Sequence, residues 1–208
     1  MVGEGVLHEC ILHPEVERIL VVNRRPCGIS NPKVVEIIHN DFFDISPIES
    51  QLKGLNACFF CLGVTSVGKQ EAEYFDLTYN LTMHFAQIIS KINPDMTFCY
   101  ISGAGTDSTE KGKSMWARVK GKTENDLMKL PFKNVYNFRP GFLQPSKGLK
   151  NVHKYYALLK FLYPLFRLTI PKYISTLKEL GLAMINSIII GYEKQILEVP
   201  DIVKLSKK

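Results

Sequence analysis

Short apolar runs alternate with amphipathic stretches along this chain. The runs are rich in β-branched and aromatic residues, and several end in glycine, which is typical of buried parallel strands. The pattern therefore predicts an α/β protein with a largely parallel, doubly wound sheet. The runs at 56–63 and 96–103 lack alternation and are expected to be central strands. The expected strands are Arg18–Asn23, Lys33–His39, Asn56–Gly63, Met96–Gly103, Asn134–Gly141 and, at an edge, Gln195–Val199.

The stretches between the runs carry apolar residues at helical spacing. They predict an opening helix ended by Pro14, a long helix over 72–92, a helix over 114–130 and a late helix over 176–189. Thr176 and Glu179 have the spacing of a capping box for the late helix. Residues 145–175 depart from this rhythm and are expected to form a small lobe or lid at the carboxyl edge of the sheet.

The composition is that of an ordinary globular protein. Hydrophobic residues make up 46% and charged residues 22% of the 208 residues, which predicts one domain over 1–208. The net charge of +6 is scattered rather than clustered, and no nucleic-acid reader motif accompanies it. Charge therefore selects no partner, and nucleic acid is not expected.

The cysteines and histidines do not form a metal motif. Cys58 and Cys61 have CxxC spacing, but neither a second pair nor a nearby histidine completes a site, so we expect the thiols to pack in the core and no metal to bind. No signal peptide and no apolar run of about 20 residues is present, which predicts a reducing, cytoplasmic setting. The apolar, lysine-containing stretch over 153–173 is interrupted by Pro164. It is interpreted as a lid or packing segment in preference to a membrane contact.

Two segments have the spacing of a dinucleotide site. Gly3 precedes the apolar helix face, as the last glycine of a phosphate-binding turn does. About twenty residues on, Asn23, Arg24 and Arg25 end a strand where an acidic residue would hold the ribose of NAD. Paired guanidinium groups bind phosphate instead, which predicts NADP(H); the alternative is a solvated basic loop. After the strand expected at 33–39, Asp41 and Phe42 are candidates for the adenine contact.

The segment "YISGAGTDSTEKGKSMWARVKGKTE" carries the densest chemistry. Ser102 ends a strand, and Trp116 and Lys120 share one helical face. Together with "NRR", "FFCLGVTSVGK" and "NFRPGFLQP", this segment resembles the Tat-interacting-protein-like branch of the atypical short-chain dehydrogenases/reductases. The resemblance covers nearly the whole chain.

The resemblance implies a Rossmann fold with bound NADP(H) and proton transfer at a substrate oxygen. It places Ser102, with Thr106 as an alternative, in the substrate-orienting role and Lys120 in the role of the lysine that holds the nicotinamide ribose. A homodimer is an expectation of the family. The cofactor-lining positions that it implies are Gly3, Arg24, Arg25, Leu62, Gly63, Lys120, Pro140 and Leu143.

Trp116 departs from the family pattern because it stands where the catalytic tyrosine is expected. An indole N–H does not titrate near neutral pH and cannot supply the proton that a phenol supplies. Tyr74, Tyr79 or Tyr100 could substitute from elsewhere, or Trp116 could be a packing residue. The function therefore stays open between an oxidoreductase or epimerase-like enzyme on a small carbonyl or alcohol and a catalytically weak NADP(H) sensor or interaction protein.

The resemblance also implies a first strand and two earlier glycines that do not precede Gly3 in this sequence. Without that strand, two half-sheets separated by roughly 10 Å would each have an unpaired inner edge. We expect a helix from about Gly3, and either no strand joining the runs at 18–23 and 56–63 or direct pairing of the two. A third hypothesis is a shortened chain with impaired cofactor binding.

Overall fold

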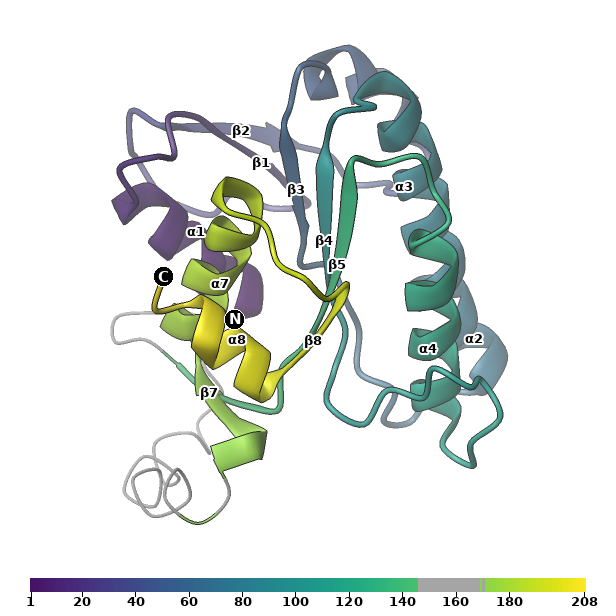
Figure 1. The fold of residues 1–208 in the computed structure, drawn as a ribbon. Coiled ribbons are helices and arrows are strands. Elements are labelled where there is room, and N and C mark those ends of the chain that lie inside the picture. Colours follow the sequence, from purple (N-terminus) through teal and green to yellow (C-terminus); the bar gives the residue numbers. More distant parts are fainter. Residues whose placement is uncertain (146–168, 170) are drawn as a thin grey trace. The chain divides into compact units, whose positions relative to one another are not determined.

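The computed structural model describes residues 1–145, 169 and 171–208, which fall into two compact units (Figure 1). One, the sheet unit, comprises Phe42–Arg139 and Tyr192–Glu198. The other, the terminal unit, comprises Met1–Asp41, Pro140–Gly191 and Val199–Lys208 as far as these are described. The single domain over 1–208 stays a prediction, and most of the expected lobe at 145–175 lies outside the described residues.

The sheet unit is built on four parallel strands in the order β3-β4-β5-β8. The two middle strands are almost wholly buried. The run at 56–63 was expected to be central, but among the described residues β3 pairs with β4 alone and lies at an edge. Three of its four residues are therefore only part-buried. The strands are β3 (Ala57–Phe60), β4 (Thr97–Ile101), β5 (Asn134–Arg139) and β8 (Ile196–Glu198).

Helices α3 and α4 cover one face of this sheet (Figure 1). The Phe60 ring on β3 lies 5.4 Å from Phe85 of α3 and 5.8 Å from Phe98 of β4, centroid to centroid. The predicted long helix is one run of three pieces with a π-helical turn in the middle. The helices of this unit are η1 (Ser46–Leu52), α2 (Glu71–Phe75), η2 (Asp76–Asn80), α3 (Leu81–Ile92) and α4 (Met115–Leu127). The short 3₁₀ helix η1 was not predicted from the sequence.

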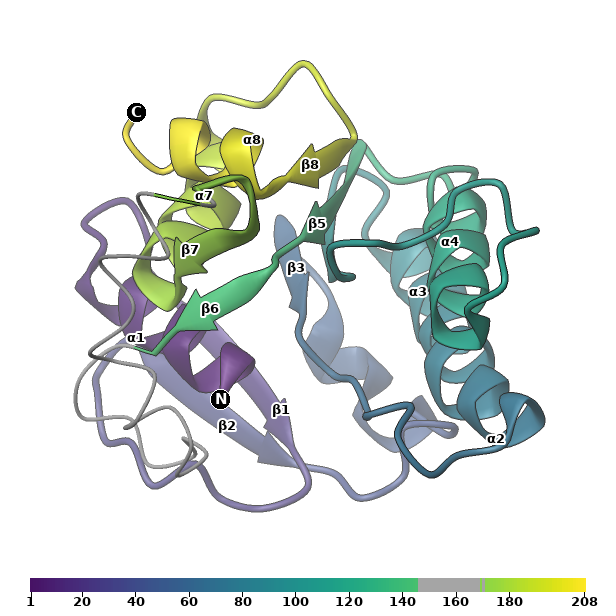
Figure 2. The same ribbon diagram turned by 90° about the horizontal axis from the view of Figure 1, so that it is seen from below.

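In the described ranges the terminal unit contains two small parallel ladders together with α1, α7 and α8 (Figure 2). β1 pairs with β2, and β6 pairs with β7. The predicted capping box is confirmed, because Thr176 Oγ1 accepts from Glu179 N at 3.0 Å and Thr176 N donates to the Glu179 carboxylate at 2.8 Å. The elements are α1 (Val2–Leu12), β1 (Ile19–Asn23), β2 (Val34–Ile38), β6 (Phe142–Gln144), η3 (Pro171–Tyr173), β7 (Ile174–Thr176), α7 (Leu177–Ile189) and α8 (Val199–Leu205).

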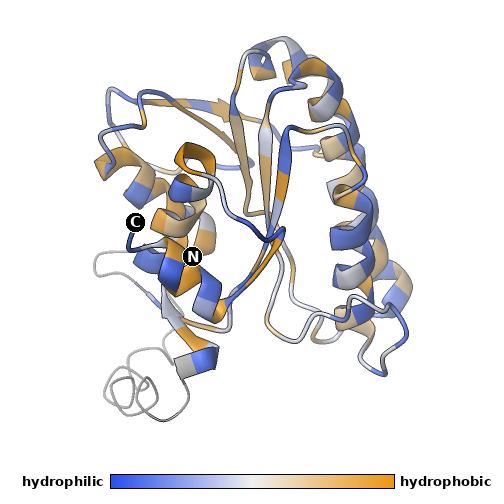
Figure 3. Ribbon diagram, in the orientation of Figure 1, coloured by the Kyte–Doolittle hydropathy of each residue, from blue (hydrophilic) through white to orange (hydrophobic). Residues whose placement is uncertain are grey.

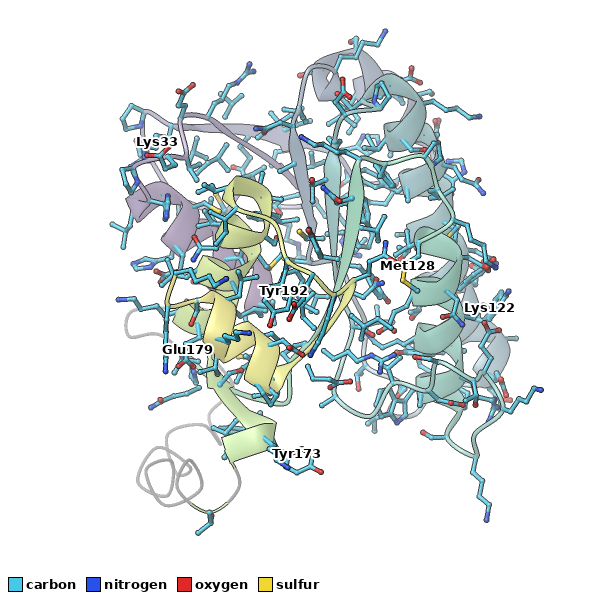
Figure 4. All side chains as sticks on the ribbon, in the orientation of Figure 1. Lys33, Lys122, Met128, Tyr173, Glu179 and Tyr192 are labelled. Carbon is cyan, nitrogen blue, oxygen red and sulfur yellow. The ribbon has the colours of Figure 1, made fainter. Side chains whose placement is uncertain are left out.

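Helices α1 and α7 approach closely because each has a glycine at the contact. A methyl group added at Gly5 would lie 2.9 Å from the Leu177 side chain, and one added at Gly181 would lie 2.7 Å from Glu9. Figure 3 shows that α7 is largely apolar, in keeping with its buried face. A second contact involves Lys33, which directly precedes β2 and is labelled in Figure 4. Its Nζ donates to the carbonyl of His13 at 2.8 Å and so connects the start of β2 to the end of α1.

The two half-sheets expected from the sequence are found as separate ladders. In the described part of the chain, β1 pairs only with β2, β3 pairs only with β4, and direct pairing of β1 with β3 is not found. The opening helix begins at Val2, one residue before the expected start. None of the helices in the described ranges is long and apolar enough to cross a bilayer.

Candidate catalytic and cofactor site

Ser102 lies at the carboxyl end of β4, where parallel α/β sheets bind their ligands. Its backbone N–H donates to Phe138 O on β5 at 2.8 Å, which fixes its position against the neighbouring strand. Its hydroxyl lies 3.0 Å from the Thr106 hydroxyl, and Thr106 in turn donates to Gly103 O at 2.8 Å. Ser102 and the alternative Thr106 are thus partners in one buried hydroxyl pair.

The Lys120 amine lies beside the same strand end. Its Nζ donates to Ile101 O, the carbonyl preceding Ser102, at 3.1 Å, and it lies 5.2 Å from the centroid of the Tyr100 ring. Burial lowers the pKa of the Lys120 ammonium from 10.5 to about 8, and the charge of Glu124 opposes this lowering. The structure therefore brings Ser102 and Lys120 together around one strand terminus.

Trp116 lies one helical turn before Lys120 on the same face of α4. Its indole packs on the turn after Ser102: methyl groups added at Gly103 and Gly105 would lie 3.7 Å and 3.6 Å from the ring. Gly105 has a φ of +89°, a conformation that favours glycine. Trp116 is therefore a packing residue on this turn. Its assignment to the tyrosine position stays a prediction.

The three tyrosines considered as substitutes are poorly suited to proton transfer. Tyr74 and Tyr100 are 2% and 1% exposed, and burial raises the pKa of both phenols. The Tyr79 hydroxyl donates to Asp126 Oδ2 at 2.8 Å, and burial together with that carboxylate raises its pKa as well. None of the three is a phenol with a pKa near neutrality.

A buried ion pair joins α4 to β5 and was missed in the sequence. The Arg139 guanidinium donates from Nε to Glu124 Oε1 at 3.0 Å, from Nη1 to Glu198 at 3.1 Å and from Nη2 to the Ser108 hydroxyl. Glu124 is fully buried one turn after Lys120. The pair therefore fixes the helix that carries Trp116 and Lys120. The only available signal was a charged residue within the apolar run "NVYNFRPG".

The loop between β4 and α4 is bound tightly to that helix. Asp107 accepts hydrogen bonds from Thr109 N at 3.0 Å and Gly112 N at 2.6 Å, and its own N–H donates to Ala117 O at 3.1 Å. A methyl group added at Gly121 would lie 1.8 Å from Asp107 O. The loop is therefore held in place by its own hydrogen bonds and by its contacts with α4.

The remaining candidate residues divide between the two units. In the sheet unit, Leu62 and Gly63 follow β3 as expected. In the terminal unit, Gly3 lies within the first turn of α1 and is exposed, while Leu143 is buried in β6. The assignment of these residues to a cofactor site stays a prediction.

Arg24 and Arg25 are exposed directly after β1. Neither takes part in an ion pair with any residue of the described ranges. Two unneutralised guanidinium groups at the end of a parallel strand are suited to a phosphate ligand.

All five cysteines are present as thiols rather than in disulfide bonds. Cys10 and Cys99 are buried, and Cys27, Cys58 and Cys61 are part-buried. No cluster of three or more histidine, cysteine or acidic side chains within the described ranges could hold a metal ion.

Comparison with known proteins links this fold to dehydrogenases and epimerases. Glucuronic acid dehydrogenase from Chromohalobacter salexigens superposes with a TM-score of 0.65 at 11% identity, covering 94% of this chain and 73% of that one. WbmG of Bordetella bronchiseptica, crystallised with NAD, gives 0.65 at 10% identity, with 99% and 74% covered. UDP-glucose 4-epimerase from Thermotoga maritima gives 0.61 at 13% identity, with 100% and 78% covered.

The chain has the Rossmann-type fold of these enzymes. The predicted fold class, a Rossmann-like parallel α/β protein, is thereby confirmed. At these identities the likeness concerns the fold alone.

Comparison by sequence finds weakly similar proteins whose names state no activity. No family model matches the chain. Protein FMP52 of Debaryomyces hansenii is 27% identical over 157 residues, covering 73% of this chain and 68% of that protein, and FMP52-1 of Scheffersomyces stipitis is 25% identical over 169 residues, covering 78% and 73%. Both are named mitochondrial proteins, so the cytoplasmic setting expected from the sequence is contradicted.

Proposed function

We propose that this chain is an NADP(H)-binding protein of the short-chain dehydrogenase type that acts on a small carbonyl or alcohol, as an oxidoreductase or epimerase-like enzyme. The observation that carries the proposal is the gathering of the Ser102–Thr106 hydroxyl pair and the Lys120 amine around the carboxyl end of β4. This edge of a parallel sheet is where Rossmann-type proteins bind ligands.

The described residues fit the proposed cofactor. Arg24 and Arg25 are exposed cations without an ion pair in the described ranges, which suits the 2′-phosphate that distinguishes NADP(H) from NAD(H). The bound nicotinamide would supply or accept hydride. In this proposal the Ser102 hydroxyl binds and orients the substrate oxygen, and the Lys120 ammonium binds the nicotinamide ribose.

Trp116 limits the chemistry that this site can perform. Its indole cannot give up a proton near neutral pH, and none of Tyr74, Tyr79 and Tyr100 offers a suitable phenol. This observation favours a second candidate function: an NADP(H)-binding sensor or interaction protein in which Ser102 and Lys120 bind without rapid turnover.

Cofactor binding is tested by titrating the protein with NADPH and NADH. Trp116 is the only tryptophan, so its fluorescence reports on the proposed site. We expect quenching by NADPH at concentrations about tenfold below those needed for NADH, and loss of that preference in the double variant Arg24→Ala, Arg25→Ala. Arg18→Ala is the matched control, because Arg18 is exposed just before β1 begins. If neither dinucleotide changes the fluorescence or binds in calorimetry, the proposal is wrong and the hypothesis of impaired cofactor binding is favoured.

Turnover separates the two candidate functions. Steady carbonyl reduction by the native chain that is abolished by Lys120→Ala supports an enzyme. Binding without turnover, with activity appearing in Trp116→Tyr, supports a sensor or interaction protein that keeps the rest of the site.

A further inference from the structure

One carboxylate closes the turn that carries the arginine pair. Glu36 lies on β2 opposite Val21 of β1. Its Oε1 atom accepts from Asn23 Nδ2 at 2.9 Å and from Cys27 N at 2.8 Å. The same oxygen therefore binds the residue just before Arg24 and a residue just after Arg25.

The ends of this turn have further anchors. Asn23 O accepts from His39 N at 2.8 Å, which continues the β1–β2 ladder past the strand ends. Pro26 fixes its own φ and stiffens the segment between Arg25 and Cys27. The backbone of the turn is thus held from both sides, while the two guanidinium groups extend into solvent.

The partners of Glu36 are neutral groups, two N–H donors and the Cys27 thiol, rather than the nearby arginines. Burial raises the pKa of this carboxyl, but the hydrogen bonds from Asn23 and Cys27 outweigh that effect and the net pKa is lowered, so it is ionised at neutral pH. No ion pair joins it to Arg24 or Arg25 in the described ranges. Its acceptor oxygen is engaged in shaping the turn, which leaves the cations available for an anionic ligand.

We infer that Glu36 is a positioning residue that determines cofactor specificity: it holds the Asn23–Cys27 turn in the shape that presents Arg24 and Arg25 to the 2′-phosphate of NADP(H). The inference rests on the proposed function. It assigns the effect to the acceptor oxygens of Glu36 rather than to its negative charge, because its partners, the Asn23 amide, the Cys27 N–H and the Cys27 thiol, are all neutral donors.

Two substitutions separate the oxygen from the charge. Glu36→Gln keeps a carbonyl oxygen that can accept both N–H groups, whereas Glu36→Ala removes it. We expect Glu36→Ala to reduce the NADPH-to-NADH affinity ratio by about tenfold, and Glu36→Gln to retain it or raise it by removing a negative charge near the phosphate. Glu17→Ala is the control, because Glu17 is an exposed acid of the same unit outside the turn.

The decisive measurement is a double-mutant cycle read by calorimetry with NADPH, NADH, adenosine 2′,5′-bisphosphate and 5′-AMP. If Glu36 acts through the arginines, Glu36→Ala has no further effect on the affinity ratio in the Arg24→Ala, Arg25→Ala background. A merely structural role would weaken both dinucleotides equally and leave the ratio unchanged.

The outcomes distinguish the two levels of the argument. A native chain without preference for NADPH or the bisphosphate refutes the proposed cofactor itself. A native preference that persists in Glu36→Ala refutes the positioning role alone. Loss of NADH binding in Glu36→Gln would assign Glu36 to the ribose hydroxyls and overturn the inference as well.

Discussion

Replacing Lys120 by methionine should stabilise the fold in a pH-dependent way. The folded chain holds the Lys120 ammonium in a buried position that lowers its pKa from 10.5 to about 8. Each pH unit of difference is worth about 1.4 kcal/mol, so the charged amine costs the folded state about 3 kcal/mol below pH 8. Methionine has similar length and no charge; it loses the hydrogen bond to Ile101 O and the contact of the ammonium with the Tyr100 ring, together worth about 1.5 kcal/mol.

The sign of the pH dependence follows from proton binding. Between about pH 8 and 10.5 the unfolded chain keeps the Lys120 proton while the folded chain releases it, so stability of the native protein rises with pH. Below pH 8 both states are protonated and the cost is present in full. The advantage of Lys120→Met over the native chain should therefore be about 1.5 kcal/mol at pH 7 and decline toward or below zero by pH 10.

Urea unfolding of both proteins at half-unit steps from pH 7 to 10 measures this difference, and groups common to both cancel. Lys122→Met is the matched control, because Lys122, labelled in Figure 4, lies on the same helix in an ion pair with Asp126 that raises its pKa. A Lys120→Met difference that does not vary with pH would show that the amine is solvated in the folded chain, and the reasoning would fail.

Three other substitutions test individual contacts within the two units. Gly121→Ala should destabilise the fold by at least about 2 kcal/mol in urea unfolding, because its methyl group would overlap the Asp107 carbonyl; an unchanged midpoint would contradict the contact. Arg139→Ala should cost about 3–5 kcal/mol, because it leaves Glu124 buried and unpaired, and a loss under 1 kcal/mol would mean that water reaches that carboxylate. Thr176→Ala should cost about 1 kcal/mol through loss of the helix cap, with Thr65→Ala in an exposed loop as the control for thermal unfolding.

The elements predicted correctly are those in which local signals agree with burial. β4 is a largely apolar strand without alternation and is buried on both faces, as the pattern indicates, and β5 is buried from Val135 to Arg139. The start of α7 after Thr176 could be predicted from its capping residues, Thr176 and Glu179. In these places the hydrophobic pattern, the capping residues and the burial of the element all favour the same structure.

The elements missed depend on partners far away in the chain. β6 and β7 are three-residue strands that pair across some thirty residues, so neither has a local pattern. The position of β3 at an edge could not be predicted from its composition, because that composition suits a strand paired on both sides.

The candidate site shows the same division. The order and spacing of Ser102 and Lys120 could be recognised from the motif. The contacts of Glu124 with Arg139 and of Glu36 with the arginine turn could not, since they join side chains on separate elements. Sequence reasoning therefore found residues of the proposed chemistry and missed the residues that position them.

Lys120 and Trp116 together make the strongest argument that this site has a function. A packing role alone would favour an apolar residue at position 120, because the buried amine lowers the stability of the fold. Its cost is offset only if the amine binds something, and the hydroxyl pair of Ser102 and Thr106 lies at the same strand end. Trp116, on the adjoining helical turn, offers no group that titrates near neutral pH, so binding by Lys120 would not be accompanied by proton transfer from that position. Enhanced stability of Lys120→Met together with lost dinucleotide binding would be the direct signature of a residue kept for binding rather than for folding.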